Sequence, residues 1–313
     1  MEYTNQRTAY GNTLVALGHE DQRIVVLDAD LAGSTMGKLF EAAFPDRHIE
    51  AGIAEANMTS MAAGLSLTGK IPFTNSFAVF SAGRAYDQIR QTIAIGKLNV
   101  KIAGSSAGLS DYGDGATHQS VEDIAYMRAI PNMTVLCPAD ANEMVQATRA
   151  AAAYHGPCYI RINRNDYPNT TGAEEPFEIG VPKVLREGTD VVVFAIGYMN
   201  NLALEAAACL EGSISVKVVN MSTIKPVNPE LIRQLVSHAK GVVTVEEHSI
   251  VGGLGSAVSE LLRLTPVPIE YVGIDDTFGC SAHSYMDVLR YHGLTTEHII
   301  EAVKSVKGGY SSL

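Results

Sequence analysis

Short apolar runs alternate with helical patterns along the first half of the chain. We expect strands at residues 23–27, 48–53, 71–74, 99–103, 133–137 and 159–162. Between them, apolar residues recur at helical spacing near residues 11–17, from residue 55 onwards, and near residues 86–95, 121–127 and 141–153. A short, wholly apolar run is typical of a strand that is buried on both faces. The alternation therefore predicts an α/β fold with a mostly parallel sheet between two layers of helices.

The pattern stops after residue 163 and resumes near residue 189. The stretch between them is rich in Asn, Thr, Gly, Glu and Pro and has little periodicity, which is typical of a linker. A second alternation follows, with strands expected at residues 191–196, 216–219, 241–245 and 267–272. The sequence thus predicts two domains, at residues 1–165 and 189–313, joined by a linker at residues 166–188. Each domain is expected to be a mostly parallel sheet flanked by helices.

Composition and charge narrow the classes of function. The 313 residues are enough for two α/β domains, and contents of 46% hydrophobic and 18% charged residues are ordinary for a soluble globular protein. A net charge of −11 argues against broad binding to nucleic acid or anionic membranes, although a few arginines can still hold a small anionic substrate. We find no signal-peptide pattern and no apolar run of bilayer length. Four scattered cysteines without a C-x-x-C motif favour free, mostly buried thiols in a reducing cytoplasm.

The strand expected at residues 99–103 leads into a loop that is dense in polar groups. Six residues, 114–119, contain Asp114, Thr117 and His118. In open α/β sheets, ligands bind at the carboxyl ends of the strands. A lone histidine there would be interpreted as a surface residue, but this combination predicts a binding site.

Two other strand ends carry candidate residues. Glu55 stands where a strand turns into a helix, and the helix dipole alone favours a carboxylate in the first turn. Its neighbours are small or apolar, so we expect it to be largely buried, which makes it a candidate for proton transfer. Phe77 and Phe80 are either core residues or the wall of a pocket for a flat heterocycle.

Two glycine motifs are weaker signals. Residues 104–108 fit G-x-S-x-G, the nucleophile motif of α/β-hydrolases, but the residues that follow make a poor start for the helix that this motif needs. Gly253-x-Gly255 resembles part of a dinucleotide-binding loop without its third glycine. Neither motif is expected to be functional.

Two possible metal motifs are also weak. Gly113-Asp114-Gly115 resembles the start of a metal–diphosphate motif, but its position in the chain does not suit one. Glu246, Glu247 and His248 have metal-binding side chains. Adjacent residues of a strand point to opposite faces, so we expect these three to form a solvated strand end.

Taken in order and spacing, these motifs resemble the carboxyl-terminal portion of transketolases, which are thiamine-diphosphate enzymes. The resemblance covers essentially the whole chain and implies a pyrimidine-binding domain, a linker and the family's C-terminal domain. It includes no counterpart of the domain that binds the diphosphate. The resemblance therefore implies one subunit of a split transketolase, without a metal ligand of its own. A partner subunit, expected to form an α2β2 assembly with it in the cytoplasm, would hold the diphosphate and Mg²⁺ or Ca²⁺.

The resemblance implies roles for four residues near the cofactor. Glu55, in Gly-Ile-Ala-Glu-Ala-Asn-Met, corresponds to the glutamate that hydrogen-bonds a pyrimidine nitrogen and relays a proton. Phe77 and Phe80 lie in the segment that packs on the pyrimidine ring. Asp30, in Asp-Leu-x-x-Ser, corresponds to a residue near the cofactor.

The resemblance also implies a substrate site. Asp114 and His118 correspond to a pair that bonds the sugar hydroxyls near the reacting carbons, where His118 also assists proton transfer. Arg7, Ser34 and Arg164 correspond to three of the groups that hold the substrate phosphate.

The implied activity is the transfer of a two-carbon ketol unit from a ketose, a phosphate or a related anionic sugar, to an aldose. One departure matters, because a fourth phosphate-binding group of the family, a histidine, is Ser106 here. The acceptor therefore stays open. Alternatives are the β subunit of a 2-oxo acid dehydrogenase, a synthase like that of deoxyxylulose phosphate, an α/β-hydrolase acting through Ser106, and a noncatalytic scaffold subunit.

Overall fold

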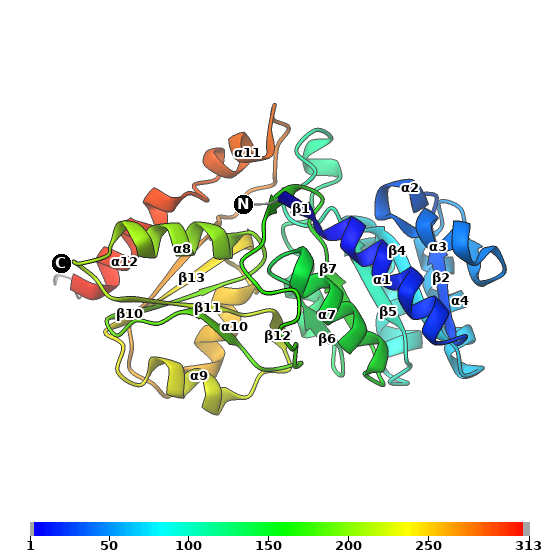
Figure 1. The fold of residues 1–313 in the computed structure, drawn as a ribbon, viewed down its shortest axis with the longest axis horizontal. Coiled ribbons are helices and arrows are strands. Elements are labelled where there is room, and N and C mark those ends of the chain that lie inside the picture. Colours follow the sequence, from blue (N-terminus) through cyan, green and yellow to red (C-terminus); the bar gives the residue numbers. More distant parts are fainter. Residues whose placement is uncertain (1–2, 309–313) are drawn as a thin grey trace.

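Two α/β halves lie side by side in the computed structural model, which describes residues 3–308 (Figure 1). The first half contains a seven-stranded sheet. From edge to edge its strands are β12 (Thr223–Lys225), β6 (Thr134–Leu136), β7 (Cys158–Arg161), β5 (Lys101–Ser105), β4 (Ile71–Phe77), β2 (Ile24–Asp28) and β3 (His48–Glu50). All neighbouring strands are parallel except β12, which runs antiparallel to β6. The prediction of a mostly parallel sheet is confirmed.

Helices cover both faces of this sheet. They are α1 (Gln6–Glu20), α3 (Gly37–Ala43) and α7 (Ala141–Ala153) on one face, and α4 (Glu55–Leu67), η3 (Ile89–Ala94) and α6 (Asp123–Ala129) on the other. Successive strand residues alternate between the faces, so Ile24 and Val26 pack with the first group and Val25 and Leu27 with the second. This burial on both sides explains why the strand sequences are apolar runs.

The second half contains a five-stranded sheet with the same layered plan. Its strands, in spatial order, are β14 (Ile269–Ile274), β13 (Gly241–Ser249), β10 (Val191–Ala195), β11 (Val216–Asn220) and β9 (Lys183–Arg186). Only β9 is antiparallel to its neighbour. The helices are α8 (Met199–Cys209), α11 (Tyr285–Tyr291) and α12 (Thr296–Gly308) on one face, and α9 (Pro229–Val236) and α10 (Leu254–Leu261) on the other (Figure 1).

The two halves are joined by more than the chain that links them. β12 follows β11 in sequence but adds an edge strand to the first sheet. The start of the linker is in turn tied to the first half, because β1 (Tyr3–Asn5) pairs antiparallel with β8 (Asp166–Pro168). One hydrophobic cluster includes Val135 of the first sheet and Val192 of the second. The halves therefore share a continuous core, which fixes one against the other.

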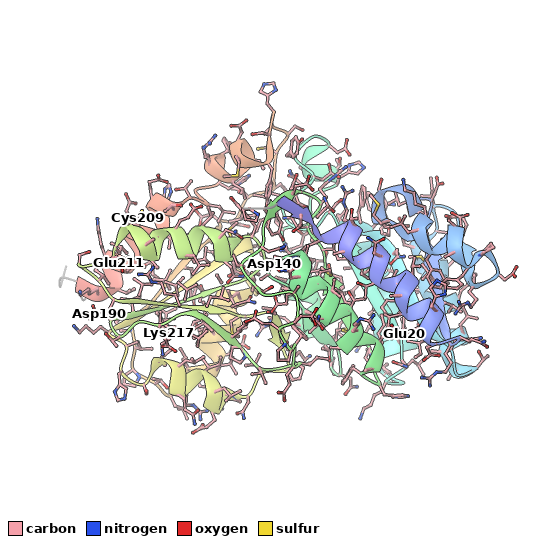
Figure 2. All side chains as sticks on the ribbon, viewed as in Figure 1. Glu20, Asp140, Asp190, Cys209, Glu211 and Lys217 are labelled. Carbon is pink, nitrogen blue, oxygen red and sulfur yellow. The ribbon has the colours of Figure 1, made fainter. Side chains whose placement is uncertain are left out.

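The predicted linker at residues 166–188 is more ordered than its composition indicates. It contains β8 and β9, and it is attached to the first half at Asp140, which lies near the middle of the molecule (Figure 2). The Asp140 carboxylate accepts hydrogen bonds from the backbone N–H groups of Thr170 and Thr171, at 2.6 and 2.8 Å. The irregular sequence of the linker therefore does not make it a free segment, because polar side chains of the first half form hydrogen bonds with its backbone groups.

Two further elements differ from the predicted ones. The strand expected at residues 48–53 ends at Glu50, because Gly52 has a positive φ of 68° that breaks the extended backbone. The helical turns expected at residues 86–95 begin earlier, with η2 (Val79–Arg84) and α5 (Tyr86–Gln88) before η3. Wide π turns in η2 and η3 replace a regular α-helix there.

The cysteines and the helices bear on two other expectations. All four cysteines are free, but only Cys137 and Cys158 are buried, while Cys280 is half-buried and Cys209 is exposed. The thiols are thus less uniformly buried than predicted. Between residues 3 and 308, no helix combines the length and the apolar character needed to cross a membrane.

Candidate active site

Glu55 is the first residue of α4, at the carboxyl-end edge of the first sheet. Its side chain is buried, and Nη1 of Arg84 lies 3.2 Å from its Oε1. The helix N-terminus and the guanidinium both place positive charge next to this buried side chain. The expected burial of Glu55 is confirmed, whereas no sequence pattern indicated Arg84 as its partner.

Phe77 and Phe80 form an aromatic wall next to this carboxylate. Phe77 ends β4 and is buried, whereas Phe80 lies in η2 and is half-buried. Their rings are stacked with centroids 6.0 Å apart and planes 20° apart, and the Arg84 guanidinium lies 4.1 Å from the Phe80 centroid. A buried carboxylate beside a partly exposed aromatic face fits a flat, hydrogen-bonding heterocycle such as the thiamine pyrimidine.

His118, in the loop of residues 114–119, lies against Phe77 and Phe80. Its ring meets those of Phe77 and Phe80 edge-on, at centroid distances of 6.1 and 5.4 Å. Its Nδ1 lies 2.9 Å from Oγ1 of Thr117, and the ring is half-buried. Asp114 is exposed at the start of the short helix η4 (Gly115–Thr117). The structure therefore gathers Glu55, both phenylalanines and His118 at one site.

Arg7, Ser34 and Arg164 gather near the same strand ends. Nη1 of Arg7 donates a hydrogen bond of 2.9 Å to the backbone carbonyl of Ser34, not to its hydroxyl. The Arg164 guanidinium lies 5.9 Å from the Phe77 centroid and forms an ion pair with Asp111, a residue that sequence reasoning missed. Burial and then the charge of Arg164 lower the pKa of Arg7, so the two guanidinium groups lie within electrostatic reach of each other.

Asp30 stands in the loop that follows β2. It has a positive φ of 58°, and its backbone N–H donates to Oε1 of Glu50, which also accepts from the N–H of Gly52. In the part of the chain that the structure describes, no polar contact joins the exposed Asp30 carboxylate to the other site residues. Glu50 thus holds together the loops that carry Asp30 and Glu55.

Ser106 does not form a hydrolase site. It is fully buried with φ of 52°, but the chain continues as a loop, and no α-helix begins before Asp123. A nucleophile motif needs a strand, a turn and a helix that present an accessible hydroxyl. The glycine pair at 253–255 does not bind a phosphate either, because Glu246 accepts the N–H groups of Leu254 and Gly255 at 2.6 and 2.8 Å.

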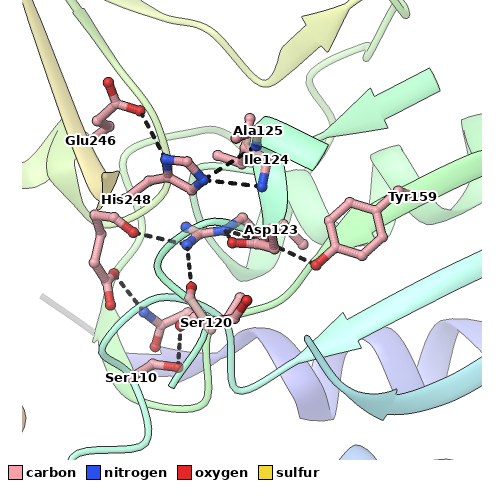
Figure 3. A network of polar contacts seen from close by, with 12 residues as sticks. Ser110, Ser120, Asp123, Ile124, Ala125, Tyr159, Glu246 and His248 are labelled. Carbon is pink, nitrogen blue, oxygen red and sulfur yellow. Dashed lines mark hydrogen bonds and ion pairs between the residues drawn. The ribbon is translucent and has the colours of Figure 1, made fainter. Parts of the chain in front are cut away.

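The prediction of a solvated strand end at Glu246, Glu247 and His248 is wrong. All three side chains are buried between the two halves, and burial raises the pKa of both glutamates to about 7 and lowers that of His248 to about 4. His248 Nε2 accepts from the N–H of Ile124, at 3.1 Å, at the start of α6 (Figure 3). Among residues 3–308, no group of three or more His, Cys, Asp or Glu side chains is placed to hold a metal ion.

The buried residues Glu246 to His248 contact the loop that carries Asp114 and His118. Glu247 accepts hydrogen bonds from the N–H of Leu109 at 2.7 Å and from the Tyr285 hydroxyl at 2.5 Å. Gln119 donates through its Nε2 to the carbonyls of Leu109, Asp111 and Cys280. The second half therefore fixes the loop that carries Asp114 and His118, a role that its local sequence pattern did not reveal.

Comparison with known proteins agrees with this arrangement. Residues 3–170 match the family "Transketolase, pyrimidine binding domain", and residues 180–299 match "Transketolase, C-terminal domain". A solved structure described as "Split gene transketolase, inactive beta4 tetramer" is 44% identical, with a TM-score of 0.89, and the alignment covers 98% of this chain and 99% of that one.

Two relatives of similar length have named substrates. The 6-deoxy-6-sulfo-D-fructose transketolase subunit SqwH of Clostridium sp. (strain MSTE9) is 41% identical over 96% of this chain and 94% of its own length. A subunit of the apulose-4-phosphate transketolase of Phocaeicola vulgatus is 34% identical over 96% of this chain and 97% of its own length. The chain belongs to the transketolase family and corresponds to the subunit that carries the pyrimidine-binding and C-terminal domains.

Proposed function

We propose that this chain is the subunit of a thiamine-diphosphate-dependent transketolase that supplies the pyrimidine contacts and the sugar-binding loop. The reaction moves a two-carbon ketol unit from a ketose to an aldose. The observation that carries the proposal is the convergence of the buried Glu55 carboxylate, the Phe77–Phe80 wall and His118 at one edge of the first sheet.

Glu55, Phe77 and Phe80 would hold the cofactor's pyrimidine. When bound, thiamine diphosphate supplies the electron sink that is needed to break a C–C bond between a carbonyl and a hydroxyl-bearing carbon. Glu55 would hydrogen-bond a ring nitrogen and exchange a proton with it, a role for which a buried, fixed carboxylate is suited. Asp30 would lie at the margin of this site.

Asp114 and His118 would bind the sugar. His118 is positioned by Thr117 and by the aromatic wall, so its ring can bond a substrate hydroxyl and assist proton transfer. Asp114 would select the configuration of a hydroxyl, because a bound sugar would cover its exposed carboxylate, and an analogue without that hydroxyl would leave the covered carboxylate unpaired. Arg7, Ser34 and Arg164 would surround the distal end of the substrate.

The remaining parts of the site would come from a second subunit. We propose that this partner holds the diphosphate and Mg²⁺ or Ca²⁺, that the assembly is α2β2, and that domains at residues 1–165 and 189–313 flank the linker. The free cysteines favour a reducing cytoplasm. Deoxyxylulose-phosphate synthases are relatives too, but the match covers only 46% of one such enzyme, from Symbiobacterium thermophilum, against 94% of SqwH.

Reconstitution with the partner subunit tests the proposal. The two purified subunits are mixed with thiamine diphosphate and Mg²⁺, and ketol transfer from a ketose to an aldose is measured. We expect activity only with both subunits, and the Glu55→Gln variant should lower kcat by about 10²-fold or more.

Glu20→Gln is the matched control, since Glu20 is an exposed carboxylate that pairs with Arg149 at the far end of α1 (Figure 2). Binding of thiamine diphosphate to each reconstituted variant, measured by calorimetry, gives a readout besides activity. Full turnover by Glu55→Gln would instead support a scaffold role for this subunit.

A further inference from the structure

Asp111 places a buried negative charge at the distal end of the substrate site. Only 2% of the residue is exposed, and its carboxylate forms an ion pair with Arg164, whose own side chain is 29% exposed. The guanidinium that would meet the far end of a substrate is therefore already paired with an acid.

Hydrogen bonds fix the backbone on both sides of this ion pair. The Asp111 carbonyl accepts from the N–H of Gly115 and from Nε2 of Gln119, each at 3.2 Å. The Arg164 carbonyl accepts from Nδ2 of Asn5 at 2.9 Å. The neighbours are also joined, because Nδ2 of Asn165 donates to the Ser110 carbonyl at 2.9 Å. The two backbone segments that carry the ion pair are therefore fixed next to each other, which keeps the Asp111 carboxylate within reach of Arg164.

The charges around Arg7 and Arg164 balance. Asp111 and Asp166 both act on Arg7 as opposing negative charges, and Arg7 already donates to the Ser34 carbonyl. Ser106, the position at which family resemblance places a phosphate-binding histidine, is neutral and fully buried. Two arginines and two aspartates leave no net positive charge at this end of the site.

A phosphate dianion is poorly matched to such a site. It would lose its hydration and lie next to a buried carboxylate, where low polarity strengthens the repulsion. A terminal hydroxyl has no charge to compensate, and it can hydrogen-bond to the guanidinium without displacing Asp111. A like charge that opposes one ligand and tolerates another is a recognised source of specificity.

We propose that Asp111 is a specificity-determining residue that makes this subunit prefer sugars ending in a hydroxyl over their phosphate esters. The proposal rests on the transketolase function proposed above and names its substrate class.

The test compares D-ribose and D-ribose 5-phosphate as acceptors in the reconstituted enzyme, with one unphosphorylated ketose as the common donor. We expect kcat/KM for ribose to exceed that for its phosphate by about tenfold or more. Asp111→Asn keeps the size of the side chain and removes its charge, and it should shift this ratio towards the phosphate by about tenfold or more. Inorganic phosphate should inhibit this variant and not the natural protein.

Two other variants complete the design. Asp46→Asn changes an exposed aspartate of η1 (Pro45–Arg47) and should leave the ratio unchanged. Asp111→Ser provides a second uncharged variant if the asparagine variant fails to fold, as judged by thermal unfolding. A natural preference for ribose 5-phosphate, or a ratio unmoved by both Asp111 variants, would overturn the proposal. If the natural reconstituted enzyme transferred the ketol unit to neither acceptor, this result would instead count against the transketolase function itself.

Discussion

Glu55 and Arg84 form an ion pair of 3.2 Å in which one partner is buried and the other faces solvent. The Glu55 side chain is 6% exposed and that of Arg84 is 54% exposed. The same guanidinium lies over the Phe80 ring at 4.1 Å. Arg84 thus connects the carboxylate to the aromatic wall, two parts of the site that lie on different elements.

Replacement of Arg84 should weaken cofactor binding moderately. Arg84→Met keeps the packing on Phe80 and removes the charge that holds Glu55. Because solvent screens an ion pair with one exposed partner, we expect the free energy of unfolding to fall by about 1 kcal/mol at most. The thiamine diphosphate concentration for half-maximal activity should rise by up to about tenfold, which corresponds to about 1.4 kcal/mol. A loss of kcat as large as that of Glu55→Gln would show instead that Arg84 acts in the chemical step.

His118→Asn should impair transfer without affecting folding. The side chain is half-buried on a loop, where it contacts Thr117 and the two phenylalanine rings. We expect kcat/KM to fall by about 10²-fold, the usual effect of losing a general acid–base group. The free energy of unfolding should change by about 0.5 kcal/mol or less, as measured in urea. Unchanged kinetics would remove His118 from the proposed site.

Glu247 should make stability depend on pH. Burial raises the pKa of its carboxyl to about 7, above the value near 4.5 of an exposed glutamate. When folding raises the pKa of a group, the folded state binds the proton more tightly than the unfolded state does. The stabilisation from this proton is complete below the pKa of the unfolded state, and it is lost as the pH rises through the pKa of the folded state.

The free energy of unfolding of the natural chain, relative to Glu247→Gln, should therefore fall by about 2–3 kcal/mol between pH 4.5 and pH 7.5. Urea denaturation at several pH values measures this difference. Glu301→Gln, at an exposed position of α12, is the control and should show no such slope. A pH-independent difference for Glu247→Gln would contradict the burial of an ionisable carboxyl there.

Gly108→Ala should destabilise the junction between the two halves. Gly108 has φ of 63°, and an added Cβ would lie 2.6 Å from Oε1 of Glu247. Backbone strain together with this clash predicts a loss of about 2–4 kcal/mol in urea denaturation. Gly64→Ala offers a matched control in the last turn of α4, where an added Cβ meets nothing within 4 Å, and should stabilise by about 0.5–1 kcal/mol. Equal stabilities for the two variants would rule out the strain argument.

The local order of the sequence was enough to predict the layered α/β plan and the position of Glu55, Phe77 and His118 at strand ends. The reason is that burial on both faces of a sheet imposes apolar runs on the strands, and that the ends of parallel strands meet at one edge. The sequence pattern thus predicts that Glu55, Phe77 and His118 lie near one another, but it does not predict which side chains they contact.

Packing between distant segments decided the rest. The pattern at Glu246 to His248 is that of a polar strand end, yet the first half of the molecule packs against this end of β13, and all three side chains are buried. Nothing local indicates that β12 crosses to the first sheet, or that Asp111 meets Arg164. The spacing of apolar residues indicates which face of a segment is buried. Which two charged side chains form a pair depends instead on which segments, distant in the sequence, pack against each other.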